Sequence, residues 1–297
     1  ELDGALRRRR CRDLEREGAE VVVLPVSSDG LVDLQSLKFF LNEQTVLVSV
    51  MYASNEIGTI QPLQEISRII RDFRSHQQTS GSQYPFFHTD AVQAFQYLSC
   101  RVDELGVDLL TLSAQKIYGP KGTGLLYVRD RAAKLMQSMI TGGHQEFGLR
   151  AGTENTPLIV GFAKAMELAE SMRMRESLRI EKLRDYFFTR LQEFIPAVQL
   201  NGSLKGRLPN ICNVYFPSHS ISDLLIALDL RGVAVSPGSA CQARVTEESY
   251  VVRALGGPAD RASSSIRFSF GRSTTRKEID KSLAILKNIF KGGMSSR

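Results

Sequence analysis

The stretch 108–130 constrains the fold of this chain more than any other. Residues 109–112 and 125–128 are short apolar runs rich in Leu, Val and Tyr and bounded by turn residues, which is typical of strands. Between them, Gly119-Pro120 and the glycines at 122 and 124 predict tight turns that let a ligand approach the backbone. Lys116 therefore follows directly after a strand, in a loop that we expect to be rigid. In an open α/β sheet, ligands bind at that position.

Strands and helices alternate through the first half of the chain. Residues 45–52 are almost continuously apolar, as in a strand buried on both faces, and residues 86–90 form another short strand. A helix is predicted to begin at Pro62. This alternation predicts an α/β fold with a mostly parallel, doubly wound sheet. We expect a large domain over residues 1–165 and a smaller α+β C-terminal domain over residues 166–297.

Several further elements follow from local patterns. Strands are predicted over residues 20–26, 210–216 and 265–271, because these runs are apolar or alternate in polarity. A long helical region is predicted from Pro157 to about residue 194, and a last helix over residues 279–290. A helix from residue 91 is also expected, with Gln93 in its first turn.

Polar residues follow three of the predicted strands. Asn55, Asp90 and Lys116 each come just after a strand end. Right-handed crossovers bring the ends of consecutive parallel strands to the same edge of a sheet, so we expect these side chains to converge. Their convergence is the hypothesis for a functional site.

Composition limits the class of protein. The chain has 297 residues, a net charge of +6 and 42% hydrophobic residues, as in ordinary globular proteins, and no apolar run approaches the ~18 residues of a membrane helix. We interpret the arginine run at 7–10 as a solvated helix face, so neither a membrane nor a nucleic acid is an expected partner. The cysteines lack disulfide or metal spacing, which favours thiols in a reducing compartment and predicts no metal. They are Cys11, Cys100, Cys212 and Cys241.

The residues around Lys116 favour Schiff-base chemistry. Ser113 and Lys116 match the Ser-x-x-Lys pattern of penicillin-recognising enzymes, but the further motifs of those enzymes do not occur in this sequence. A lysine that loses its charge by burial can instead condense with an aldehyde. Pyridoxal 5'-phosphate requires such a lysine, an acid beside its ring nitrogen, which Asp90 could supply, and groups that bind its phosphate. Ser113 and Gln115 could hydrogen-bond that phosphate.

Motifs along nearly the whole chain resemble the cysteine desulfurases, which belong to the class V aminotransferase group. The similarity rests on HTDAVQ at 88–93, SAQKIYGPKG at 113–122, Gly-Thr at 152–153, RLPN at 207–210, SPGSAC at 236–241 and SIRFS at 265–269. The resemblance implies the type I fold of pyridoxal-phosphate-dependent transferases. It also implies conversion of L-cysteine to L-alanine, with sulfur passed to an enzyme cysteine.

The resemblance implies a role for each matching residue. Lys116 would bind the cofactor covalently and move protons, and Cys241 would be the nucleophile that becomes a persulfide. At the cofactor ring, Asp90 would contact the ring nitrogen, Gln93 the ring oxygen, and Asn55 the ring or the substrate. At the phosphate, the contacts would be Ser113 and Gln115, together with Thr153 across a dimer interface. Arg267 would hold the substrate carboxylate, because its planar fork of donors suits that group.

Two features depart from the family pattern. Gln115 stands where the family has histidine, and an amide can donate a hydrogen bond but cannot titrate. The family's amino-terminal phosphate loop and its ring-stacking histidine are not found, so we expect the chain to lack that portion.

Three functional hypotheses follow. They are a cysteine desulfurase serving iron–sulfur cluster assembly or thiolation, a selenocysteine lyase, and a truncated, non-catalytic dimerising homologue. The expected partners are L-cysteine or selenocysteine, a second copy of the chain, and a sulfur-accepting or scaffold protein. The expected compartment is the cytoplasm, with the mitochondrion as the alternative.

Overall fold

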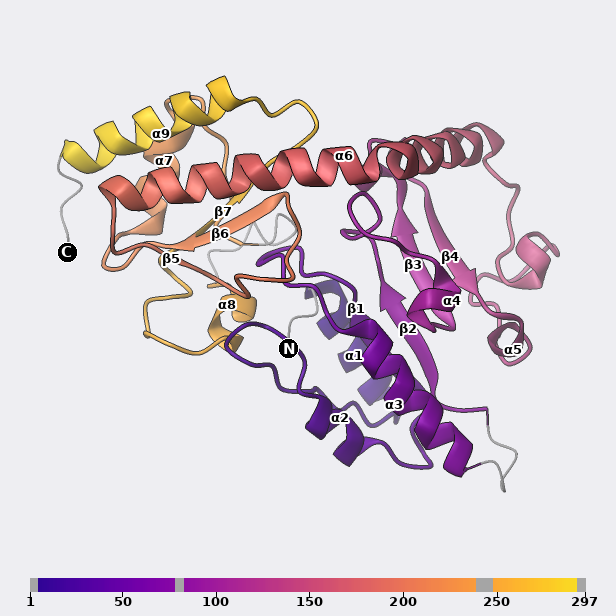
Figure 1. Ribbon diagram of the computed structural model, residues 1–297. Coiled ribbons are helices and arrows are strands. Elements are labelled where there is room, and N and C mark those ends of the chain that lie inside the picture. The colour runs from indigo at the N-terminus through magenta and orange to yellow at the C-terminus, as the bar shows by residue number, and fades with distance from the viewer. Residues whose placement is uncertain (1–4, 78–82, 239–247, 293–297) are drawn as a thin grey trace. The chain divides into compact units, whose positions relative to one another are not determined.

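The computed structural model describes residues 5–77, 83–238 and 248–292, with side chains from residue 11 onward (Figure 1). The chain forms two compact units that interleave along the sequence. Unit 1 comprises Glu1–Phe40, Ala53–Gln61 and Arg175–Arg297, and unit 2 comprises Leu41–Tyr52 and Pro62–Met174. The predicted domain boundary between residues 165 and 166 stays a prediction.

Unit 2 is built on a four-stranded sheet in the order β1-β2-β3-β4 (Figure 1). The strands are β1 (Leu47–Met51), β2 (Phe86–Asp90), β3 (Leu109–Ser113) and β4 (Gly124–Val128). The first three are parallel, and β4 is antiparallel to β3. In β3, Leu110 and Leu112 are buried while their neighbours are partly exposed, which is the period of two that a sheet imposes.

Helices complete unit 2. They are α3 (Leu63–His76), α4 (Val102–Leu105), α5 (Asp130–Ala133), the 3-10 helices η2 (Ala114–Ile117) and η3 (Glu146–Gly148), and the first part of α6 (Thr156–Phe194). α3 buries Leu63, Ile66 and Ile70, which recur at helical spacing on one face. Pro62 precedes this helix at the N-cap, one position earlier than predicted.

Unit 1 contains an antiparallel sheet in the order β5-β6-β7. The strands of this sheet are β5 (Gln199–Leu200), β6 (Ile211–Tyr215) and β7 (Ser265–Ser269). The helices of unit 1 are α1 (Ala5–Arg16), α2 (Leu34–Phe40), α7 (Ile221–Asp229), α8 (Tyr250–Ala254), α9 (Arg276–Lys291) and the end of α6. Figure 1 shows α7, α9 and α6 along this sheet. Their apolar faces form one core, in which Phe187 of α6 contacts Phe268 of β7 with ring centroids 4.7 Å apart.

A mostly parallel sheet and a separate antiparallel sheet agree with the predicted α/β and α+β organisation.

Three local predictions were wrong. Residues 20–26 are not a strand, because only Val26 makes a backbone bridge, to Val32, and a strand requires a continuous partner. Residues 91–98 form hydrogen-bonded turns instead of a helix. β1 is not buried on both faces, because it is at the edge of the sheet and Leu47 is 47% exposed.

Candidate active site

The carboxyl ends of β2 and β3 place three of the predicted residues at one edge of the unit 2 sheet. Asp90 ends β2 and is paired in register with Thr111, and Ser113 ends β3 two residues further on. The chain then enters η2, which carries Lys116. Asp90 and Lys116 thus follow neighbouring parallel strands at the same edge, which is where ligands bind in open α/β sheets.

Asp90 is oriented by the backbone. Its Oδ1 accepts a hydrogen bond of 2.8 Å from the N–H of Val92, which forms a local turn of the kind that aspartate stabilises. The strand ladder also continues past it, because the N–H of Ala91 donates to the carbonyl of Thr111. The carboxylate therefore has a fixed place at the strand end.

The loop after Lys116 is held by close packing and by unusual backbone angles. Tyr118 ends η2 in the left-handed region with φ +64°. A Cβ on Gly119 would lie 3.0 Å from the carbonyl oxygen of Ala114 and 3.0 Å from Cβ of Ala165, tighter than most packed contacts. Any larger residue at 119 would therefore have to displace its neighbours. The predicted rigid loop has a physical basis in this contact with α6.

The lysine itself is exposed, as is Gln115 beside it, so burial does not withdraw it from water as the Schiff-base hypothesis supposed. Gln93 is half-buried in the turns after β2, and Thr153 is exposed in the segment between η3 and α6. These residues and the sheet-edge group all belong to unit 2. Their roles stay predictions.

Asn55 and Arg267 are brought together within unit 1. Nη1 of Arg267 donates to the carbonyl oxygen of Asn55 at 2.8 Å. The main chain that follows Asn55 is also fixed, because Nδ2 of Asn213 donates to the carbonyl of Glu56 at 3.0 Å and Nη2 of Arg207 donates to that of Ile57 at 2.6 Å. Three side chains from the C-terminal part of unit 1 therefore hold the segment that carries Asn55.

Cys241 lies outside the described residues. Among the described cysteines, none is in a disulfide. Burial raises the pKa of Cys100 and of Cys212 to about 12, so both stay protonated and unreactive at neutral pH. This agrees with the expectation that the cysteines are free thiols.

The residues of unit 2 fit pyridoxal 5'-phosphate by their chemistry. Lys116 supplies an amine, Asp90 an oriented carboxylate for a protonated ring nitrogen, and Ser113 and Gln115 neutral donors for phosphate oxygens. All four lie at one sheet edge, next to the loop in which Gly119 packs against Ala114 and Ala165. The donor set therefore matches an aldehyde cofactor that carries a phosphate.

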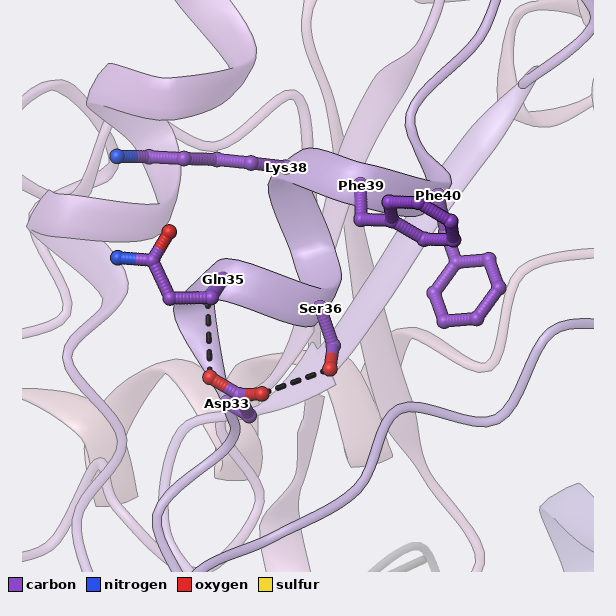
Figure 2. A pocket seen from close by; sticks show the side chains of 6 residues that line it. All are labelled: Asp33, Gln35, Ser36, Lys38, Phe39 and Phe40. Atoms are coloured by element: carbon purple, nitrogen blue, oxygen red, sulfur yellow. Dashed lines mark hydrogen bonds between the residues drawn. The ribbon is translucent and has the colours of Figure 1, made fainter.

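Sequence reasoning missed Glu56, which is completely buried beside Asn55. The signal was present, because a charged residue within SNEIG directly follows an apolar strand and buried carboxylates need specific partners. A shallow hollow at α2, in contrast, contains no predicted site residue, and within it Asp33 accepts hydrogen bonds from the N–H of Gln35 and from Oγ of Ser36 (Figure 2). It is lined by Asp33, Gln35, Ser36, Lys38, Phe39 and Phe40.

Comparison with known proteins identifies the class. The family model "Aminotransferase class-V" matches residues 9–281, and the chain belongs to this family. It is 44% identical over 279 residues to the cysteine desulfurase IscS of Dictyoglomus turgidum, covering 94% of this chain and 68% of the relative. It is also 44% identical over 270 residues to the mitosomal cysteine desulfurase of Encephalitozoon cuniculi, covering 91% of this chain and 60% of the relative.

A solved structure named NifS-like protein superimposes with a TM-score of 0.87 at 32% identity, covering 98% of this chain and 74% of that one. The predicted fold class is confirmed by this likeness, and the predicted cofactor is that of the family. The relatives favour neither the selenocysteine lyase nor the non-catalytic homologue. The chain spans 56% to 68% of the length of the curated relatives it matches. No helix among the described residues is long and apolar enough to cross a membrane.

Proposed function

We propose that this chain acts as a pyridoxal-phosphate-dependent cysteine desulfurase, which converts L-cysteine to L-alanine and passes the sulfur to Cys241. The observation that carries the proposal is the sheet edge of unit 2, where Asp90 and Lys116 follow neighbouring parallel strands. The names of the curated relatives support the same activity.

Lys116 and Asp90 have complementary tasks. When bound, the cofactor supplies an aldehyde that condenses with an amine and a ring that withdraws electrons from the substrate. Nζ of Lys116 would hold the cofactor covalently and would take and return protons at the substrate carbons. The carboxylate of Asp90, held by the N–H of Val92, stabilises positive charge on the ring nitrogen.

Arg267 and Asn55 would bind the substrate carboxylate. A guanidinium offers parallel N–H donors that match the two oxygens of a carboxylate. Both the main chain and the side chain of Arg267 are held in place, because its main chain pairs with that of Ser236 and its Nη1 donates to the carbonyl oxygen of Asn55. A side chain held this way loses little freedom on binding, which favours affinity.

Cys241 would receive the sulfur. Its thiolate attacks the substrate sulfur, a sulfur–sulfur bond forms, and the bond between that sulfur and the substrate carbon breaks. The electron pair stays with the carbon, which takes a proton from Nζ of Lys116 and leaves as part of alanine. The persulfide on Cys241 is then available to a sulfur acceptor or a scaffold for cluster assembly.

The active form is proposed to be a homodimer. The reason is the role expected of Thr153, which would bind the phosphate of a cofactor held by a second copy of the chain. Unit 2 exposes large apolar side chains that a partner could cover, and such exposure is a mark of interaction surfaces. They include Leu126, Met139, Ile140, Phe147 and Val160. For the compartment we propose the cytoplasm, with an organelle as the alternative, since two of the relatives are named mitosomal.

Two variants test the activity. The purified protein with cofactor should show an absorption band in the visible. Lys116→Ala should remove that band, and Lys121→Ala, in the same loop, should keep it.

With L-cysteine and a reductant, the protein should release sulfide and alanine in equal amounts. Cys241→Ala should reduce this by at least ~100-fold, as loss of a nucleophile does, whereas Cys11→Ala should not. A colourless wild-type protein, or unchanged sulfide release from Cys241→Ala, would refute the proposal.

A further inference from the structure

Three consecutive backbone carbonyls in the segment that follows β1 are bound by side chains. The carbonyl oxygens of residues 55–57 each accept one hydrogen bond, and the donors are, in order, Arg267 at 2.8 Å, Asn213 at 3.0 Å and Arg207 at 2.6 Å. A carbonyl in the protein interior needs such a donor when no helix or sheet supplies one, because water cannot reach it. Side chains therefore take the place of a strand partner along this segment.

The segment is closed to solvent around one residue. Residues 53–59 are buried except Asn55, which is half-buried, as is Arg267. A ligand can therefore reach these two residues, while the chain on either side of Asn55 is packed against protein. Because the side chain of Asn55 projects from the main chain at 55–57, its position depends on the three donors.

Asn213 is an unusual residue for its place in the fold. It lies in the middle of β6, whose five residues are all buried, and it is 0% exposed. Asparagine is disfavoured in strands, and its amide is costly to bury unless it is hydrogen-bonded. Both ends of the amide are used, since Oδ1 accepts from Nδ2 of Asn201 at 2.8 Å and Nδ2 donates to the carbonyl of Glu56. Burial alone would favour an apolar residue, so this asparagine indicates a task at residue 56.

The direction of these hydrogen bonds is fixed by Arg261. A guanidinium can only donate, and Nε of Arg261 donates to Oδ1 of Asn201 at 2.7 Å. Asn201 must therefore present its NH₂ group to Asn213, which must in turn present its own NH₂ group to the carbonyl of Glu56. A rotated amide at 213 would place donor against donor and acceptor against acceptor. The bond to residue 56 thus has one permitted orientation.

Asn213 is also coupled to Arg267. The two residues are direct partners in the antiparallel pair of β6 and β7. Opposite residues of such a pair project to the same face of the sheet, and here their side chains donate to consecutive carbonyls, those of Asn55 and Glu56. Because the two bonds share one short stretch of main chain, the loss of one changes the geometry of the other.

We propose that Asn213 is a positioning residue for the substrate carboxylate, because its hydrogen bond to the carbonyl of Glu56 holds Asn55 and Arg267 in the arrangement that receives that group. The inference rests on the proposed function in that Asn55 and Arg267 are taken as the pair that binds the carboxylate. Loss of the bond frees the main chain at 55–57 and weakens ligands that carry a carboxylate. Ligands without a carboxylate keep their affinity.

The first test compares two ligands of the cofactor-loaded protein. L-Alanine has an amine, a methyl group and a carboxylate, and ethylamine is the same molecule without the carboxylate. Titration of each, followed by the change in the visible absorption band, gives its dissociation constant. For Asn213→Ala we expect the dissociation constant of L-alanine to rise about tenfold and that of ethylamine to change less than about twofold, because only the carboxylate contacts are weakened.

Steady-state kinetics with L-cysteine give the corresponding prediction for turnover. In Asn213→Ala, KM should rise about tenfold and kcat should change less than about twofold, because the carboxylate is held equally before and during the reaction.

Hydrogen exchange gives a measurement that depends on neither ligand nor activity. The N–H groups of Ser54, Gly58 and Ile60 are hydrogen-bonded to backbone carbonyls. In the cofactor-loaded protein, peptides that cover residues 53–61 should exchange about fivefold faster in Asn213→Ala than in the wild type, because local opening becomes easier. Peptides of α9 should exchange at the same rate in both.

Two further variants separate the hydrogen bond from general stability. Asn213→Asp keeps the size of the side chain and the acceptor for Asn201 but loses the donor, so at alkaline pH it should resemble Asn213→Ala. Tyr215→Phe removes another hydrogen bond of β6, the one of 2.7 Å to Asp260. This control should leave both ligands and the exchange of residues 53–61 unchanged.

The outcomes are distinguishable. Unchanged exchange of residues 53–61 in both Asn213 variants would overturn the positioning role, as would an unchanged affinity for L-alanine. Equal weakening of L-alanine and ethylamine would also overturn it, since that would show a general disturbance of the site. A wild type that binds L-alanine but releases no sulfide from L-cysteine would refute the proposed function alone, and the two ligands would still decide the role of Asn213. A wild type whose absorption does not respond to L-alanine would overturn this inference as well.

Discussion

Asp108 is a buried and heavily paired charge of unit 2. The residue is 2% exposed, and its carboxylate accepts hydrogen bonds from Arg74 and Arg131 at 2.6 Å and from the N–H of Phe87 at 2.8 Å. Burial raises the pKa of Asp108, but the hydrogen bonds from Arg131 and Phe87 and the charge of Arg74 lower it by more. The net pKa is therefore below the ordinary value, and the charged form stabilises the fold.

Asp108→Asn should destabilise the protein at pH 7 by about 3–5 kcal/mol, because two arginines lose their buried counter-charge. A carboxyl group whose pKa is lowered by folding contributes stability above its unfolded pKa of ~3.9, and this is lost as the pH falls through the folded value. The deficit of the variant should thus shrink below about pH 4.

Urea unfolding at several pH values measures this difference in the free energy of unfolding. Asp72→Asn, at an exposed position of α3, is the control and should change stability by less than ~0.5 kcal/mol. A deficit of Asp108→Asn that stays constant down to pH 3 would contradict the assignment.

The residues that the sequence could reveal are those next to strand ends. Asp90 and Lys116 could be placed because topology alone brings the ends of parallel strands to one edge. The partners of Glu56 and Asp108 could not be predicted, because Ser249 and Arg131 are far away from them in the sequence. No local pattern specifies which distant side chain a buried charge will meet.

At the scale of the element, α9 shows how capping sets a boundary. Oγ1 of Thr275 accepts the N–H of Glu278, and the carboxylate of Glu278 accepts the N–H of Thr275 in return, which is a capping box. The helix therefore begins at Arg276, three residues before the predicted start. The pattern Thr-x-x-Glu was visible in the sequence, but the prediction followed the apolar residues from 279 onward.

Thr275→Ala should lower the free energy of unfolding by about 1 kcal/mol, because two N–H groups at the start of α9 lose their acceptors or orientation. Thermal or urea unfolding monitored by circular dichroism measures the change. Ser282→Ala, on the same helix but outside the cap, should have a smaller effect. Equal effects of the two variants would show that the cap does not matter.

At the scale of the whole molecule, the proposed homodimer is open to direct measurement. Phe147 is 100% exposed and Val160 is 62% exposed, although both are apolar. If a second copy covers them, light scattering after size exclusion should give the mass of two chains. Charged substitutions at these positions should then favour the monomer.

The variants are Phe147→Asp and Val160→Asp, and the control is Leu204→Asp, which changes an exposed apolar residue of unit 1. We expect the dissociation constant to rise at least ~10-fold in the first two and to stay unchanged in the control, because burying an unpaired charge is costly. A wild-type protein that is monomeric at all concentrations would refute the dimer.

The sequence by itself determined most of the elements and the family of this protein. Period-two and helical patterns predict most strands and helices, and the order of motifs leads to a family with a lysine-bound cofactor. These features depend on neighbours along the chain, whose spacing is fixed by covalent geometry. Only the tertiary structure decided that residues 20–26 lack a continuous strand partner, and that Glu56 accepts a hydrogen bond from Ser249. The physical reason is that long-range contacts arise from packing of distant segments, which no local pattern encodes.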